Sequence, residues 1–282
     1  MKILEFLTQK MPTPEPFGWF HLLMFGLTII TTILFCVFFR NVNDKTFRKI
    51  IFICWIVFLV FELYKELTYV INWNFDETGK LIDVSYSWYA FPFQFCSTPF
   101  YILPFIVFLP YGKIRDAFMA YTASFVLFAG FIVMLIPGDV FVQQIGIDIQ
   151  TMVHHGLQVV LGVYVAVYNR KRYEGKFKDI LNWYWPGLVV FACMATVAII
   201  LNESVFASGV LDGATFNMFF ISSHFTCTLP VLSMFANDIP YLVYLCVYLF
   251  GFAVVAALMF AIQWVFIVPF QKLLNKFTHK NA

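Results

Sequence analysis

Apolar residues run through this chain in stretches of about 20 residues, the length that an α-helix needs to cross a bilayer. Shorter polar stretches separate them. The pattern predicts an all-α fold: a polytopic membrane helical bundle with about seven transmembrane helices, in one integral membrane domain that covers residues 1–282. The predicted spans are residues 18–39, 47–70, 88–109, 114–135, 149–168, 180–201 and 241–270.

One further segment, residues 215–236, is apolar enough to span but carries several polar side chains, among them Asn217 and His224. Counting it as an eighth span would place the lysine-bearing carboxy-terminal tail outside the cell. We therefore interpret it as a re-entrant or interfacial helix on the outer side, where irregular backbone is tolerated if protein surrounds it.

Composition agrees with a membrane protein. Hydrophobic residues make up 61% of the chain and charged residues only 12%, whereas soluble domains carry about 25% charged residues. No cleavable signal peptide is expected. Of the 18 Lys and Arg residues, 14 fall on one side of the predicted spans. The positive-inside rule then predicts a multi-pass cell-membrane protein with its amino terminus outside and its carboxy terminus in the cytoplasm.

The most informative stretch is residues 91–99, Phe-Pro-Phe-Gln-Phe-Cys-Ser-Thr-Pro, within the third predicted span. Bilayer-buried segments normally avoid polar side chains, because hydrocarbon cannot satisfy them. Here Gln94, Cys96, Ser97 and Thr98 lie between prolines, and Pro99 leaves the carbonyl of Phe95 without its helical donor. A thiol beside loosened backbone suggests a place where something binds or reacts.

Polar residues from three predicted helices fall at a similar depth. Counted from the outer helix ends, Glu62, Cys96, His154 and His155 all lie about 8–12 Å below the surface. Because neighbouring helical residues point about 100° apart, only one histidine should face the site. The polar stripe of Thr151, His155 and Gln158 favours His155.

Each of these residues also has a purely structural interpretation. The histidines can simply hydrogen-bond to other helices, and Cys96 can be a small packing residue. Glu62, Lys65 and Glu66 share one helical face, so an ion pair at the interface accounts for Lys65 and Glu66. Glu62 lies deeper and needs a partner or a proton.

The cysteines do not indicate a disulfide framework or a metal centre. All six lie in apolar segments, and the Cys-x-x-Cys spacing of zinc sites does not occur. We expect no metal, no cofactor and no nucleic-acid partner. The expected partner is a membrane phospholipid or lysophospholipid, and the sequence does not specify the oligomeric state.

Three short patches resemble a known family. Pro92-Phe93-Gln94-Phe95-Cys96 resembles a Pro-Leu-His-Leu-Cys motif, and His155-Gly156-Leu157 with Tyr164 resembles a histidine-bearing helix. A third patch begins at Asn217-Met218-Phe219 and ends at Asp238-Ile239-Pro240-Tyr241. In this order they are similar to the YwaF-like integral membrane proteins of bacteria, which are similar to an animal transmembrane acyltransferase acting on ether phospholipids. The chain departs from the pattern at Gln94, where the family has His, and lacks the basic residue after Asn-x-Met.

The resemblance implies acyl transfer by a Cys–His pair. Cys96 would attack a lipid ester and hold the acyl chain as a thioester, and His155 would move the proton. Gln94 or Asn217 would donate to the oxyanion, with Glu62, His154 and His224 in supporting roles. Transferase and lipid-ester hydrolase are not distinguished by sequence. The alternatives are a proton-coupled transporter that uses the same Glu and His, and a non-catalytic lipid-binding membrane protein.

Overall fold

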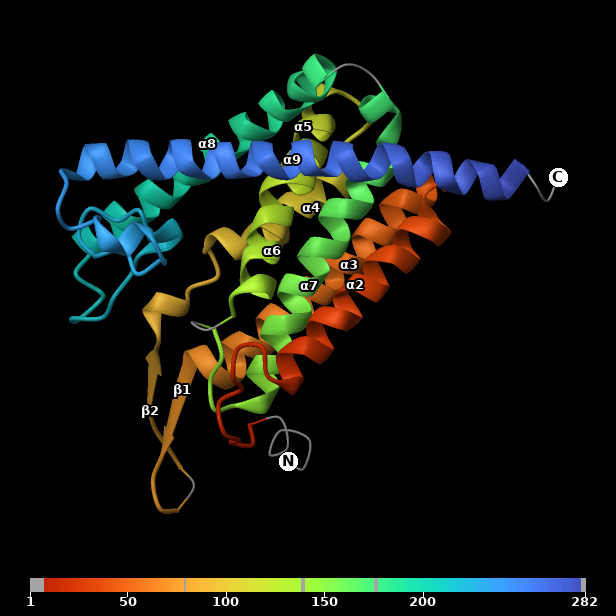
Figure 1. Ribbon diagram of the computed structural model, residues 1–282. Coiled ribbons are helices and arrows are strands. Elements are labelled where there is room, and N and C mark those ends of the chain that lie inside the picture. Colours follow the sequence, from red (N-terminus) through yellow and green to blue (C-terminus); the bar gives the residue numbers. More distant parts are fainter. Residues whose placement is uncertain (1–7, 79, 138–139, 175–176, 280–282) are drawn as a thin grey trace.

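The chain folds as a bundle of α-helices with one small β-hairpin. The structure is a computed structural model that describes residues 8–78, 80–137, 140–174 and 177–279. α2, α3 and α7 run side by side, and α9 crosses the bundle obliquely (Figure 1). The α-helices are α2 (Trp19–Phe39), α3 (Asp44–Lys65), α4 (Thr98–Phe108), α5 (Lys113–Tyr121), α6 (Leu127–Leu135), α7 (Ile145–Tyr168), α8 (Phe177–Ala207) and α9 (Tyr241–His279).

Five helical segments in the described residues are long and apolar enough to cross a membrane, so the chain is a multi-pass membrane protein. They are α2, the continuous rod of α5 and α6, then α7, α8 and α9. The prediction of seven such helices is met only in part. α3 has 22 residues but carries charges near both ends, and α4 has only 11 residues, too few to span alone.

The third predicted span is not one helix. It consists of two 3₁₀ turns, η2 (Trp88–Ala90) and η3 (Phe95–Ser97), followed by α4. Pro92 explains the break, since a residue before proline is driven out of the α region; Phe91 has φ −49° and ψ 138°. The predicted depth of Cys96 assumed a continuous helix from Trp88 and does not apply.

Residues 208–240 contain no α-helix, although this stretch is described throughout. The expected re-entrant or interfacial helix is instead a loop with two 3₁₀ turns, η6 (Met218–Phe220) and η7 (Leu232–Met234). Phe219, Phe220 and Val231 have φ of 58°, 59° and 68°. Such left-handed backbone is costly for bulky residues and persists only where surrounding contacts enforce it.

A β-hairpin that the sequence did not predict connects α3 to the broken helix. A five-residue π-helical segment, η1 (Glu66–Val70), ends α3 and leads into β1 (Ile71–Phe75), which pairs antiparallel with β2 (Leu81–Tyr86). The register places Ile71 opposite Tyr86, so the hairpin returns the chain to the end of α3. The expectation of an all-α fold therefore holds for the bundle but not for this segment.

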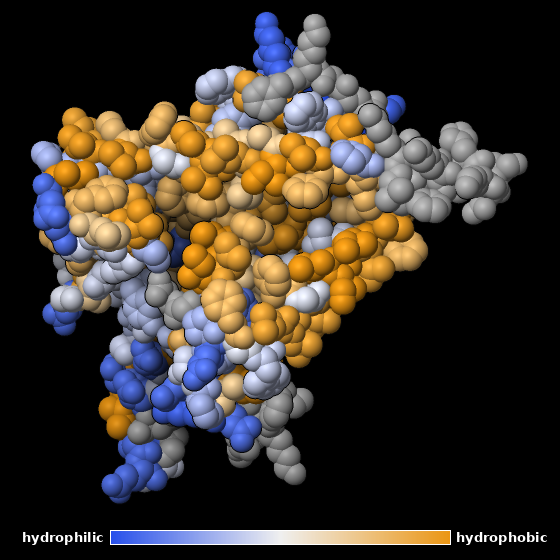
Figure 2. Space-filling view, viewed as in Figure 1, coloured by the Kyte–Doolittle hydropathy of each residue, from blue (hydrophilic) through white to orange (hydrophobic). Residues whose placement is uncertain are grey.

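Glycines allow α7 to pack closely against its neighbours. A Cβ added at Gly130 of α6 would lie 2.5 Å from the carbonyl oxygen of His155. A Cβ at Gly156 would lie 2.5 Å from the hydroxyl of Thr28 in α2. Small residues at such crossings are typical of helix packing in membranes. Outside these crossings, large apolar side chains of α2 and α9 remain exposed and form a hydrophobic band (Figure 2).

Candidate functional site

The carbonyl oxygens released by prolines in the broken third helix all find donors. The hydroxyl of Thr98 donates to the carbonyl oxygen of Phe95 over 2.9 Å, the group that Pro99 leaves unpaired. Pro104 likewise leaves the carbonyl oxygen of Phe100 without its helical donor. This oxygen accepts a hydrogen bond from the indole of Trp55 at 3.0 Å. The segment is therefore held in one conformation by side chains.

Cys96 lies at the start of this segment and is held from α7 through its backbone. The Nε2 of His154 lies 3.0 Å from the carbonyl oxygen of Cys96, and the side-chain amide of Gln158 donates to the same oxygen over 2.6 Å. Because His154 and Gln158 are four positions apart, both project from the same face of α7. Neither of these two bonds involves the thiol.

The two hydrogen bonds of the histidines fix their neutral tautomers. A carbonyl oxygen only accepts, so His154 carries its proton on Nε2, and His155, whose Nδ1 lies 2.7 Å from the oxygen of Thr151, carries its proton on Nδ1. The remaining nitrogens are His154 Nδ1 and His155 Nε2. Both are buried and have no hydrogen-bond partner among the described residues. Each of these two nitrogens carries a lone pair that can accept a proton.

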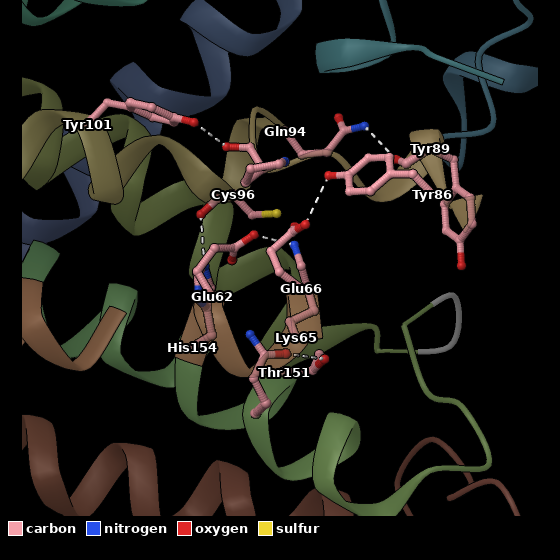
Figure 3. Close-up of polar contacts among 12 residues, drawn as sticks. Glu62, Lys65, Glu66, Tyr86, Tyr89, Gln94, Cys96, Tyr101, Thr151 and His154 are labelled. Carbon is pink, nitrogen blue, oxygen red and sulfur yellow. Dashed lines mark hydrogen bonds and ion pairs between the residues drawn. The ribbon is translucent and has the colours of Figure 1, made fainter. Parts of the chain in front are cut away.

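A charged group on α3 and η1 borders the thiol. Glu62 and Lys65 form an ion pair of 2.5 Å between Oε1 and Nζ, and Glu62 is 6% exposed. Both charges act on Cys96 electrostatically. Figure 3 shows the sulfur of Cys96 on the side of Lys65 and Glu66, whereas its carbonyl points to His154.

The β-hairpin contacts this charged group through Tyr86. Its hydroxyl donates to Oε2 of Glu66 over 2.9 Å (Figure 3). Burial and this bond to a carboxylate raise the pKa of Tyr86, so the phenol keeps its proton. The end of β2 is thereby attached to the start of η1, near Cys96.

The chain matches one known family over most of its length. The match covers residues 16–264. The chain belongs to the TMEM164 family. No curated protein and no solved structure matches it. All the site residues named above lie within the part that matches the TMEM164 family.

In this TMEM164-family chain, Gln94 joins the Cys96 segment to the loop of residues 208–240. Its side-chain amide donates to the carbonyl oxygens of Asn217 at 3.1 Å and of Tyr89 at 3.4 Å. Its oxygen accepts from the backbone amide of Phe219 at 3.1 Å. These bonds support the left-handed backbone of Phe219, whose ring packs 5.7 Å from that of Phe95.

The hydrogen bonds of Asn217 and His224 go to residues other than Cys96. The amide of Asn217 donates to the oxygens of Phe225 and Thr226, each at 3.2 Å. The Nε2 of His224 lies 2.8 Å from Oε2 of Glu203 near the carboxy-terminal end of α8, and its ring stacks on Phe206. Both residues stabilise the loop of residues 208–240.

The structure brings His154 against the backbone of Cys96, with the ring of His155 packed on that of His154 and the Glu62–Lys65 ion pair nearby. Two contacts were missed. Gln158 was assigned to a polar stripe but not to the site, and its spacing of four from His154 was the available signal. Tyr86 gave no signal, because its position depends on the hairpin.

Proposed function

We propose that the chain is a membrane-embedded lipid acyltransferase, or lipid-ester hydrolase, with Cys96 as its nucleophile. The TMEM164 family is linked to ether-lipid acyltransferase activity. The observation that carries the proposal is the position of Cys96 at a break between helices. Its thiol lies on the side of Lys65 and Glu66, and its carbonyl oxygen is bonded by His154, which like the adjacent His155 has an unpartnered ring nitrogen. The patches quoted above further suggest a place among the bacterial YwaF-like proteins.

In the proposed first step, the Cys96 sulfur attacks the carbonyl carbon of a phospholipid ester. A histidine takes the thiol proton, the carbonyl π electrons move to oxygen, and a tetrahedral intermediate forms. The intermediate then expels the lysophospholipid alkoxide, which receives the proton from the imidazolium. The products are a lysophospholipid and an acyl thioester on Cys96.

In the second step, the hydroxyl of a lysophospholipid or of water attacks the thioester. The same histidine takes the proton of this hydroxyl and returns it to the departing sulfur. A lysolipid acceptor gives a new phospholipid, whereas water gives a free fatty acid. No cofactor or metal is needed to balance either step.

We assign the base to His155 and a positioning role to His154. The Nδ1–H of His155 is anchored on the oxygen of Thr151, which holds the ring and leaves Nε2 as the basic nitrogen, the arrangement that orients the base in hydrolytic triads. The Nε2–H of His154 is committed to the backbone of Cys96. Its contribution is to hold the nucleophile's peptide.

We further propose seven membrane crossings with the amino terminus outside. The 14 of 18 cations on one side support this orientation. It places Cys96 in the outer half of the bilayer, within reach of the ester groups of outer-leaflet phospholipid. α3 and the short α4 would then cross as internal members of the bundle.

The test is acyl transfer in proteoliposomes. Purified protein would receive phospholipid with a labelled acyl chain, with and without lysophospholipid. We expect labelled product phospholipid when acceptor is present, and an acyl adduct on the intact protein that hydroxylamine removes. Release of labelled fatty acid alone would assign the hydrolase, and the absence of both products and adduct would contradict the proposal.

A further inference from the structure

The proposed reaction needs a hydrogen-bond donor for the oxyanion, and the two amides expected to supply it are already used. Both Gln94 and Asn217 donate their side-chain N–H groups to backbone carbonyls. A side-chain amide has only two N–H donors. An oxyanion role for either would require one of these bonds to be given up. A donor that is free in the resting structure is therefore needed.

A tyrosine on α9 carries such a free donor. The side chain of Tyr248 is 0% exposed, and its hydroxyl has no hydrogen-bond partner among the described residues. Burying an unpaired hydroxyl is costly, so natural structures rarely keep one. The tyrosines before it on the same face are satisfied: Tyr241 donates to Ile221 at 2.9 Å and Tyr244 to Phe220 at 2.7 Å.

Ring contacts connect Tyr248 to the segment that carries the nucleophile. Its ring stacks on Phe252 at 4.1 Å, and Phe252 lies 4.9 Å from the ring of Phe95, the residue before Cys96. The phenol approaches from α9, whereas His154 and Gln158 approach from α7.

We propose that Tyr248 is a further catalytic residue, whose hydroxyl donates a hydrogen bond to the oxyanion of the tetrahedral intermediate at Cys96. This inference rests on the proposed function. No proton is transferred: the phenol stays neutral and donates its hydrogen bond only while the carbonyl oxygen carries its negative charge. The hydroxyl that is unpaired at rest thus gains its partner when charge develops, which is the arrangement that favours a transition state over a ground state.

The test is Tyr248→Phe, which removes only the hydroxyl. Loss of one oxyanion donor typically lowers kcat by about 10²–10³-fold, and we expect a fall of this size in transfer and in acyl-adduct formation. Because the hydroxyl is unpaired, its removal should leave thermal stability unchanged or raised. Unchanged transfer would overturn the proposal, as would a loss of transfer that comes with a loss of stability.

Two variants complete the experiment. Tyr184→Phe removes a hydroxyl of α8 that donates to the oxygen of Ala253 over 2.6 Å; it should lower stability and leave transfer per folded molecule unchanged. Cys96→Ala separates a failure of the thioester mechanism from a failure of the role proposed for Tyr248. Transfer by Cys96→Ala would disprove the thioester mechanism itself, whereas an inactive Cys96→Ala with a fully active Tyr248→Phe would remove only the role of Tyr248.

Discussion

The Nε2 of His154 and the carbonyl oxygen of Cys96 lie 3.0 Å apart, although 58 positions separate the two residues. The bond joins α7 to the break in the third helix. It uses the peptide of Cys96 and leaves the thiol free. Substitutions of the Cys96 side chain can therefore test its chemistry without breaking this contact between helices.

Cys96→Ala should abolish acyl transfer and the acyl adduct. Its cost in stability should be on the order of 1 kcal/mol, because only one sulfur is lost from packing. Cys96→Ser should be nearly as inactive, since a hydroxyl is much harder to deprotonate than a thiol. Transfer assays would be paired with thermal unfolding in detergent. Cys36→Ala, at a second buried cysteine, is the matched control and should keep full activity.

The two histidines should respond differently to substitution. His155→Ala should lower transfer by about 10²-fold or more, the range of general base catalysis. His154→Gln should retain most activity, because its amide can still donate to the oxygen of Cys96, whereas His154→Ala cannot. The measurement is kcat for each variant. If His154→Gln is as inactive as His155→Ala, then His154 and not His155 is the general base.

Gln94→Leu should destabilise the fold rather than stop the chemistry. The substitution leaves the amide of Phe219 and the oxygen of Asn217 without their partner, and each buried unpaired group costs about 1–3 kcal/mol. Thr196→Ala, whose hydroxyl is exposed and bonds only within α8, sets the baseline. Unchanged stability combined with a 10²-fold fall in kcat would instead make Gln94 an oxyanion donor.

Gly130→Ala should separate α6 from α7. The new Cβ would lie 2.5 Å from the oxygen of His155 and 2.6 Å from Cβ of Gln158, and overpacking of this kind costs about 1–3 kcal/mol. Gly251→Ala is the control, since a Cβ there meets nothing within 4 Å. Thermal unfolding should show a lower midpoint for the first variant and an equal or higher one for the second.

Membrane orientation can be measured with an impermeant maleimide. Glu77→Cys, at the exposed tip of the hairpin, should be labelled on intact cells. Lys280→Cys, in the carboxy-terminal tail, should be labelled only after permeabilisation. The cysteine-containing parent corrects for background. Labelling of Lys280→Cys on intact cells would contradict an odd number of crossings with the amino terminus outside.

Sequence predicted the general architecture because hydrocarbon imposes a simple rule on composition. Prolines marked residues 91–99 as loosened backbone, but residues 88–109 were still expected to form one span, and the break into two 3₁₀ turns and α4 was not predicted. Sequence also did not predict the hairpin, whose position depends on Tyr86 reaching Glu66 across the chain. Helical periodicity predicted that His154 and His155 point in different directions. It did not predict which segment each histidine faces. The roles of Gln94 and Asn217 depend on loop conformations that no periodic pattern encodes.

The π-helical segment η4 (Thr122–Val126) joins α5 to α6 and marks one extra residue in an otherwise α-helical rod. In the widened turn, the carbonyl oxygen of Ala123 accepts from the side chain of Gln263 in α9. Because the wide turn absorbs that residue, deleting it would restore the regular α-helix and leave Gly130 of α6 facing α7. Only the contacts of the wide turn would be lost, among them the bond from Gln263 to Ala123. A one-codon deletion at this point should therefore be better tolerated than one elsewhere along the same rod, where it would rotate the following residues by about 100°.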